Sequence, residues 1–181
     1  MVIRTMIIIS ECKLKRKSDA YFFVDCPVQE HRCPSCGGRL RYRDFRKRIM
    51  RLEGGEKLRL LVRRFRCEKC GHYHTELPDC VFPYKHYATE VICGVLDEIV
   101  SPDDLDSETF PSAMTMLRWL QWFLKNFQNM EGRLRRTMMM LHRNVPDGSL
   151  LARLKSHTQG WLETVLRMIY NSGGFLEPLQ R

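Results

Sequence analysis

Two Cys-x-x-Cys pairs constrain the fold of this 181-residue chain more than any other feature. The first pair is Cys33 and Cys36, and the second pair, Cys67 and Cys70, follows after 30 residues. Two-residue spacing lets both sulfurs of a pair reach one ion, and two pairs together supply a tetrahedral set of thiolates. Four thiolates suit zinc, and a closed site leaves no open position for catalysis. We therefore predict one structural Zn²⁺ ion held by these four cysteines.

The residues around the two pairs predict a zinc ribbon, in which a β-hairpin separates the two halves of the metal site. Gly37 and Gly71 directly follow the pairs, where a tight turn needs a residue that tolerates positive φ. His72 and His74 follow the second pair and are weaker candidate ligands, because four cysteines already complete the site.

The remaining cysteines are expected to be small buried thiols. Cys12, Cys26, Cys80 and Cys93 lie in apolar or turn contexts. The sequence shows no export signal, which predicts a reducing, cytoplasmic setting in which disulfides are rare. No uncharged apolar run approaches the roughly 18–20 residues that a membrane span requires, so no membrane association is expected.

The basic charge of the chain is confined to its first half. The net charge is +9, from 30 basic and 21 acidic residues. Residues 1–85 hold 20 of the basic and 10 of the acidic side chains, whereas residues 86–181 hold 10 and 11. A basic excess on one part of a chain points to a polyanionic partner.

Most of this excess lies between the two cysteine pairs. Residues 39–66 contain twelve basic side chains and three acidic ones, and arginine outnumbers lysine ten to two. Arginine favours forked contacts to phosphates and base edges. Strict alternation would place Arg39, Arg41 and Arg43 on one face of a strand. The predicted nucleic-acid contacts of this hairpin are Arg39, Arg41, Arg43, Arg46, Lys47, Arg48, Arg63 and Arg64. Tyr42, Phe45 and Phe65 are interleaved with them. These rings could stack on bases, although packing under the ribbon is the expected use.

Apolar patterning predicts an α+β protein, with strands first and helices second. Strands are expected at 6–9, 20–24, 40–50, 58–65 and 72–77, with a turn at Gly54-Gly55. Helices are expected at 87–100, in a short segment after Asp104, at 111–142 and at 149–170. The helix at 111–142 carries a near-heptad apolar stripe that includes Leu117 and Leu124. The predicted divisions are a β-rich zinc-ribbon domain at 1–85, a helix-turn-helix-like region at 86–125 and a helical extension at 126–181.

The helix that begins near Pro111 is the second candidate nucleic-acid contact. Ser112, Thr115 and Arg118 lie at three-residue intervals at its start, where hydroxyls can reach phosphates and arginine can reach a base. Trp119 and Trp122 follow, and the spacing is equally consistent with an ordinary core helix. The Met138-Met139-Met140 run and the last helix are expected to pack together, or to meet a protein partner.

Four short motifs together resemble the N-terminal zinc ribbon of bacterial transposases. They resemble more closely a family of small bacterial zinc-ribbon proteins linked to mobile elements. The resemblance rests on Cys33-Pro-x-Cys-Gly37, Arg66-Cys-x-x-Cys-Gly-x-x-His74, Pro83-Tyr-Lys-His-Tyr87 and Ser112-x-x-Thr-x-x-Arg-Trp119. It covers about residues 20–125 and implies a zinc ribbon, a helix-turn-helix and DNA binding without catalysis.

The resulting expectation is a non-enzymatic, zinc-binding protein that contacts duplex DNA as an accessory or regulatory factor of a mobile element. Two alternatives stay open: an adaptor that docks on a transposition or transcription complex, and an RNA-binding zinc-ribbon protein. No nucleophile with a base and no open metal position emerges, so neither an enzyme nor a small-molecule substrate is expected.

Overall fold

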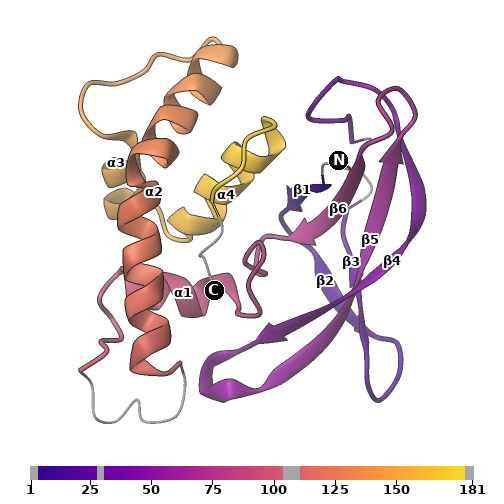
Figure 1. Cartoon of the computed structure of the whole chain (residues 1–181), viewed down its shortest axis with the longest axis horizontal. Helices are drawn as coiled ribbons and strands as arrows, with labels where there is room; N and C mark the ends of the chain where they lie inside the picture. The colour runs from indigo at the N-terminus through magenta and orange to yellow at the C-terminus, as the bar shows by residue number, and fades with distance from the viewer. Residues whose placement is uncertain (1–3, 28–30, 104–110, 178–181) are drawn as a thin grey trace.

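The computed structural model describes residues 4–27, 31–103 and 111–177 and confirms the α+β class (Figure 1). Its strands are β1 Arg4–Ile9, β2 Lys13–Arg16, β3 Phe22–Asp25, β4 Leu40–Arg51, β5 Lys57–Cys67 and β6 Tyr73–Pro78. Its helices are α1 Thr89–Leu96, α2 Ala113–Met140, α3 Leu150–His157 and α4 Trp161–Asn171, with a 3₁₀ turn η1 at Glu53–Gly55. The strands form one sheet beside the group of helices.

The sheet is built around β5, which pairs along its length with β4 in an antiparallel hairpin. On its other side β5 pairs with β6 near the end of the hairpin that carries the cysteines, and with β3 further along. β1 continues the sheet beyond β6 in parallel, and β2 continues it beyond β3. The β4–β5 hairpin therefore leaves β4 as a long edge strand (Figure 1).

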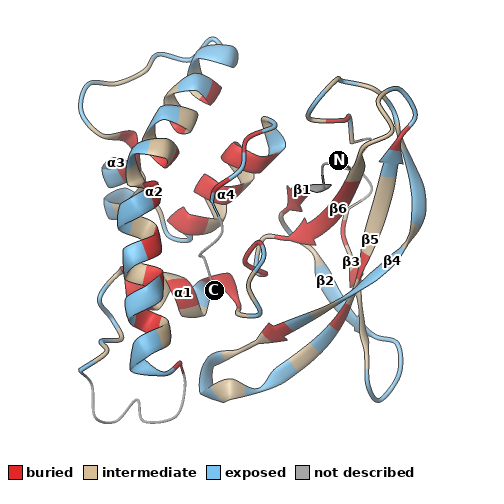
Figure 2. Cartoon of the chain, viewed as in Figure 1, coloured by how far each residue is buried: buried red, intermediate tan, exposed pale blue. Residues whose placement is uncertain are grey.

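The core joins the sheet to the helices. β1 packs against α4, and α4 packs against α2. The Asn171 side chain holds this contact by donating to the Ile8 carbonyl and accepting from the Ile8 amide, each at 2.8 Å. Buried side chains of the sheet and of all four helices belong to one apolar cluster, visible as red ribbon on the facing sides in Figure 2.

The structure corrects two predicted elements. Residues 13–16, which lie between the strands expected at 6–9 and 20–24, form strand β2, because Lys13 to Arg16 pair with β3 through backbone groups while all four side chains remain exposed. The single helix expected at 149–170 is two helices. Gly160 has a left-handed φ of 65° and lies at the start of α4, so the chain changes direction between α3 and α4.

The buried face of α2 also differs from the predicted stripe. Leu117 and Leu124 are 42% and 72% exposed, whereas Trp119 and Trp122 are buried. The indole rings offer more apolar area than leucine, so the helix turns the tryptophans inward. Burial of Trp119 and Trp122 agrees with the core interpretation of this segment.

The predicted divisions at 86–125 and 126–181 meet inside α2, which runs unbroken from Ala113 to Met140. The chain between α1 and α2 extends from residue 97 to residue 112. The short helix predicted after Asp104 lies outside the described residues.

Two of the cysteines expected to be free thiols form a disulfide instead. Cys12 and Cys26 are bonded, with their Cα atoms 4.1 Å apart. The bond links the start of β2 to the end of β3, which the antiparallel pairing of these strands brings together. Cys80, expected to be buried, is exposed.

Candidate metal centre and basic hairpin

Cys33, Cys36, Cys67 and Cys70 lie together at one end of the β4–β5 hairpin. Their sulfur atoms all fall within 4.8 Å of one another. The Cys33–Cys70 and Cys36–Cys67 sulfur distances are 3.6 and 3.5 Å. A tetrahedral zinc ion with bonds of about 2.3 Å needs ligand sulfurs about 3.8 Å apart. The four thiols therefore have the spacing of a site that could hold one metal ion.

Backbone turns after each cysteine pair create this spacing. The Gly37 amide donates to the Cys33 carbonyl at 2.8 Å, and the Gly71 amide donates to the Cys67 carbonyl at 3.0 Å. Gly37 and Gly71 have φ values of 68° and 73°, as the sequence predicts.

Gly38 is a third required glycine, which the turn motifs alone do not single out. A Cβ atom at this position would lie 2.7 Å from the Lys69 Cβ and 3.0 Å from the Cys67 sulfur. The Gly-Gly pair after Cys36 is the sequence signal that could identify it.

His74 lies beside the thiols but outside the group of four. Its ring is fully buried on β6, and its Nε2 lies 3.3 Å from the Cys33 sulfur. Burial, helped by the nearby His72, lowers the pKa of His74 to about 4, so the ring is neutral at pH 7. A neutral imidazole N–H can donate to a metal-bound thiolate without adding charge.

The environment of Cys67 favours the thiolate. Burial opposes its ionisation, but the Cys70 and Lys69 amides and the Cys36 side chain lower the pKa of Cys67 to about 6. A thiol that ionises below neutral pH is ready to bind a metal ion.

Strand β4 exposes most of its cations, seen as its pale blue colour in Figure 2. Its exposed basic side chains, with that of Arg39 just before it, are Arg39, Arg41, Arg43, Arg46 and Lys47. A register shift between Tyr42 and Asp44 leaves Arg43 as an extra residue in β4. This bulge breaks the strict alternation expected for Arg39, Arg41 and Arg43.

Three other predicted contact residues bind within the protein instead. Arg63 donates to the buried Glu76 carboxylate, at 2.5 Å from Nε, and Arg64 donates to Asp44, at 2.7 Å from Nε. Arg48 is half-buried and donates to the Phe82 and Lys85 carbonyls. The sequence predicts that Arg48, Arg63 and Arg64 face phosphates. It does not reveal their hydrogen-bond acceptors within the protein, because these lie on other strands or in the loop after β6.

Ser112, Thr115 and Arg118 lie at the start of α2, away from the cysteine cluster. Ser112 and Arg118 are exposed, and the Ser112 and Thr115 hydroxyls lie 3.0 Å apart. The positive charge of Arg118 contributes to a lowered pKa of Lys85, after the larger effect of burial. The start of α2 is thus near the loop that also accepts hydrogen bonds from Arg48.

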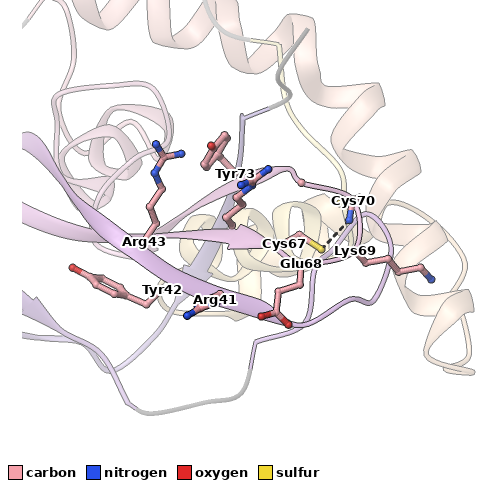
Figure 3. A pocket seen from close by; sticks show the side chains of 10 residues that line it. Arg41, Tyr42, Arg43, Cys67, Glu68, Lys69, Cys70 and Tyr73 are labelled. Carbon is pink, nitrogen blue, oxygen red and sulfur yellow. Dashed lines mark hydrogen bonds between the residues drawn. The ribbon is translucent and has the colours of Figure 1, made fainter.

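An open cleft of about 880 Å³ lies between the metal centre and the basic strand (Figure 3). Its cations are Arg41, Arg43, Arg66 and Lys69. The Arg43 guanidinium lies 4.6 Å from the centre of the Tyr73 ring, and the guanidinium of Arg66 lies 5.9 Å from it. Figure 3 shows Arg43 and Tyr42 leaving β4 on opposite sides.

Residues 33–119 match a family model described as a domain of unknown function, DUF6431. The match starts at the first cysteine of the cluster and ends at Trp119 in α2. This part of the chain, just under half of it, is therefore similar to that family and contains the thiol cluster, the hairpin and the start of α2. Comparisons with curated proteins and with solved structures find no match.

No helix among the described residues is both long enough and apolar enough to cross a membrane.

Proposed function

We propose that the protein binds duplex DNA through strand β4, and that one zinc ion at the four cysteines holds the hairpin in shape for this contact. The observation that carries the proposal is the row of exposed cations on β4 next to a cluster of four thiols. Asp44, the one acidic residue of β4, is already paired with Arg64. Arg43 also lies 3.6 Å from Asp44, and exposed arginines in an edge strand suit phosphate oxygens.

The metal centre supports the proposal because it joins both ends of the hairpin. Cys36 lies just before β4, and Cys67 is the last residue of β5. The Glu68 amide also donates to the Arg39 carbonyl at 3.0 Å. Zinc bound here would restrict the flexibility of the strand that carries Arg41 and Arg43. We further propose the accessory, mobile-element role implied by the sequence resemblance, with the start of α2 as a second DNA contact.

The test is fluorescence anisotropy of zinc-loaded protein on a short duplex at several salt concentrations. Replacing Arg41, Arg43, Arg46 and Lys47 with Ala should weaken binding by at least about 100-fold and flatten the salt dependence by about one unit of slope for each phosphate that the variant no longer neutralises. The matched control is Arg136→Ala with Arg143→Ala, which removes exposed charge near the end of α2. If the β4 substitutions and the control substitutions weaken duplex binding equally, β4 has no specific role in binding DNA.

Protein docking is a second candidate function, favoured by the exposed end of α2. Met139, Met140 and Leu141 are each 60% exposed. An adaptor would bind one protein tightly at salt concentrations that abolish its binding to DNA.

A further inference from the structure

One face of the sheet gathers aromatic rings beside lysines. In the pairing register, Lys15, Phe23, Leu61 and Lys47 form a row across β2, β3, β5 and β4. Side chains on this face point away from the buried side of the hairpin, where Leu60 and Val62 contribute to the core.

The rings on this face touch one another and reach solvent. The Phe45 ring lies 5.1 Å from Phe23 and 5.5 Å from Tyr42, and the Tyr42 ring lies 6.2 Å from Phe65. Tyr42 and Phe45 are 48% and 39% exposed. The bulge at Arg43 explains how two residues three positions apart share one face. The expectation that these rings pack under the ribbon is therefore wrong for Tyr42 and Phe45.

Two lysines lie at this aromatic face, which we define by Phe23, Tyr42, Phe45 and Phe65, or at the adjacent Tyr21 ring. The Lys17 ammonium lies 5.7 Å from the Phe45 ring centre, and the Lys47 ammonium lies 5.2 Å from that of Tyr21. Strand β2 adds exposed basic side chains, of which Lys15 pairs with Asp25 and Arg16 pairs with Asp19.

We propose that the aromatic face binds unpaired nucleotides of single-stranded DNA or RNA, with Tyr42 and Phe45 stacked on bases and Lys17 and Lys47 near phosphates. Exposed rings bind the flat surface of a base, which a duplex hides within its stack, and adjacent cations neutralise the backbone. Lysine is depleted at protein–protein interfaces, so lysines directly beside the rings favour a nucleic acid over a protein. This inference extends the proposed function from paired to unpaired strands, and rests on nucleic acid being the ligand.

The first test compares three labelled probes of about 12 nucleotides with zinc-loaded protein: a DNA strand, an RNA strand of the same sequence, and a DNA strand with abasic sites throughout. Stacking predicts that at least one ordinary strand binds about tenfold or more tightly than the abasic strand. Equal binding of the ordinary and abasic strands would overturn the inference.

The second test locates the contact. Tyr42→Ile and Phe45→Ile keep an apolar, strand-forming side chain, and each should weaken ordinary-strand binding about tenfold while leaving abasic-strand and duplex binding unchanged. Tyr42→Phe and Leu124→Ala, a change of an exposed apolar residue on α2, should leave all affinities unchanged. A base preference that survives in both isoleucine variants would overturn the inference.

The two proposals fail in distinguishable ways. If the protein binds duplex but shows no preference for bases over abasic sites, the inference about the aromatic face is wrong and the proposed function stands. If it binds no duplex and no strand, both are wrong.

Discussion

Glu131 shows how a single carboxylate joins two helices. Its side chain leaves α2 and accepts hydrogen bonds from the Leu150 and Leu151 amides, at 3.0 and 2.9 Å, and from the Ser149 hydroxyl at 2.9 Å. These amides are at the start of α3, where backbone donors lack partners within the helix. Ser149 is the N-cap residue of α3 and accepts from the Ala152 amide, so Glu131 adds a charged acceptor for the next two amides, and Arg135 pairs with the same carboxylate.

We expect Glu131→Ala to lower the free energy of unfolding by about 2–3 kcal/mol, because it leaves the amides of α3 without their charged acceptor. Thermal and urea unfolding measure this decrease. Gln128→Ala, an exposed change one turn earlier on α2, should stay within about 0.5 kcal/mol of the parent. Equal stability of both variants would show that Glu131 does not stabilise the start of α3.

Glu131 should also make stability depend on pH. Burial alone would raise its pKa, but the Leu151 and Leu150 amides, Ser149 and Arg135 outweigh burial and lower the pKa below 4.5. A carboxylate whose pKa is lowered on folding stabilises the fold above its unfolded pKa, and this contribution disappears as the pH falls through the folded value. The difference in unfolding free energy between the parent and Glu131→Gln should therefore shrink below about pH 4.5. A difference that is constant from pH 7 to pH 3 would contradict this assignment.

The Arg63–Glu76 pair is a second contact set by single residues. Glu76 is 2% exposed and also lies 3.1 Å from the Nε2 atom of His31. Arg63→Ala would leave the buried Glu76 carboxylate without its arginine partner, which should lower the free energy of unfolding by about 3–5 kcal/mol. Arg59→Ala, an exposed change on the same strand, is the matched control and should cost less than about 0.5 kcal/mol. If Arg63→Ala changes stability little but weakens DNA binding strongly, Arg63 contacts DNA and the assigned structural role is wrong.

At this scale the sequence predicts the residues whose chemistry depends on local spacing. The thiol cluster and the turns at Gly37 and Gly71 follow from short motifs. The partner of Arg63 does not, because Glu76 belongs to another strand and only the sheet register brings the two together. The disulfide was missed for the same reason, since pairing of β2 with β3 places Cys12 beside Cys26.

Among the elements, we expect the β4–β5 hairpin to depend on a metal ion bound at its end. We expect protein expressed with zinc to hold one ion per chain at the four cysteines. Removal by a chelator, or Cys67→Ser, should lower the melting temperature by about 10 °C or more, because binding of a structural zinc ion adds directly to folding stability. Cys80→Ser changes an exposed cysteine outside the cluster and should retain both the ion and the melting temperature. Full metal content in Cys67→Ser would contradict the assigned ligand set.

The sequence predicts the types of the elements better than it predicts where they end or which face of a helix is buried. Alternation and turn residues locate the β4–β5 hairpin, and helical spacing locates α1 and α2. The sequence does not predict the break between α3 and α4, because apolar spacing continues from Leu154 to Trp161 across it. The buried face of α2 was misassigned because the tertiary packing of Trp119 and Trp122 outweighs the leucine stripe.

At the scale of the whole molecule, the two halves of the chain differ in charge but share a core. The basic half supplies the sheet, and the nearly neutral half supplies helices that cover its β1 edge. Packing of α4 on β1 leaves the part of β4 nearest the cysteines exposed, whereas its other end contacts the segment after β6, where Met50 is buried and the Arg51 amide donates to the His86 carbonyl (Figure 1). The sequence predicts the charge asymmetry, but not that the last helix closes onto the first described strand.

Hydrogen–deuterium exchange of the zinc-loaded protein, with and without saturating duplex DNA, tests whether β4 contacts the DNA. As an edge strand, β4 has amides that no neighbouring strand protects on one side, so a bound duplex should slow their exchange. We expect the strongest protection in peptides covering residues 39–51, with little change in α3 and α4. Protection confined to residues 112–118 or to the C-terminal helices, with β4 unchanged, would contradict this expectation.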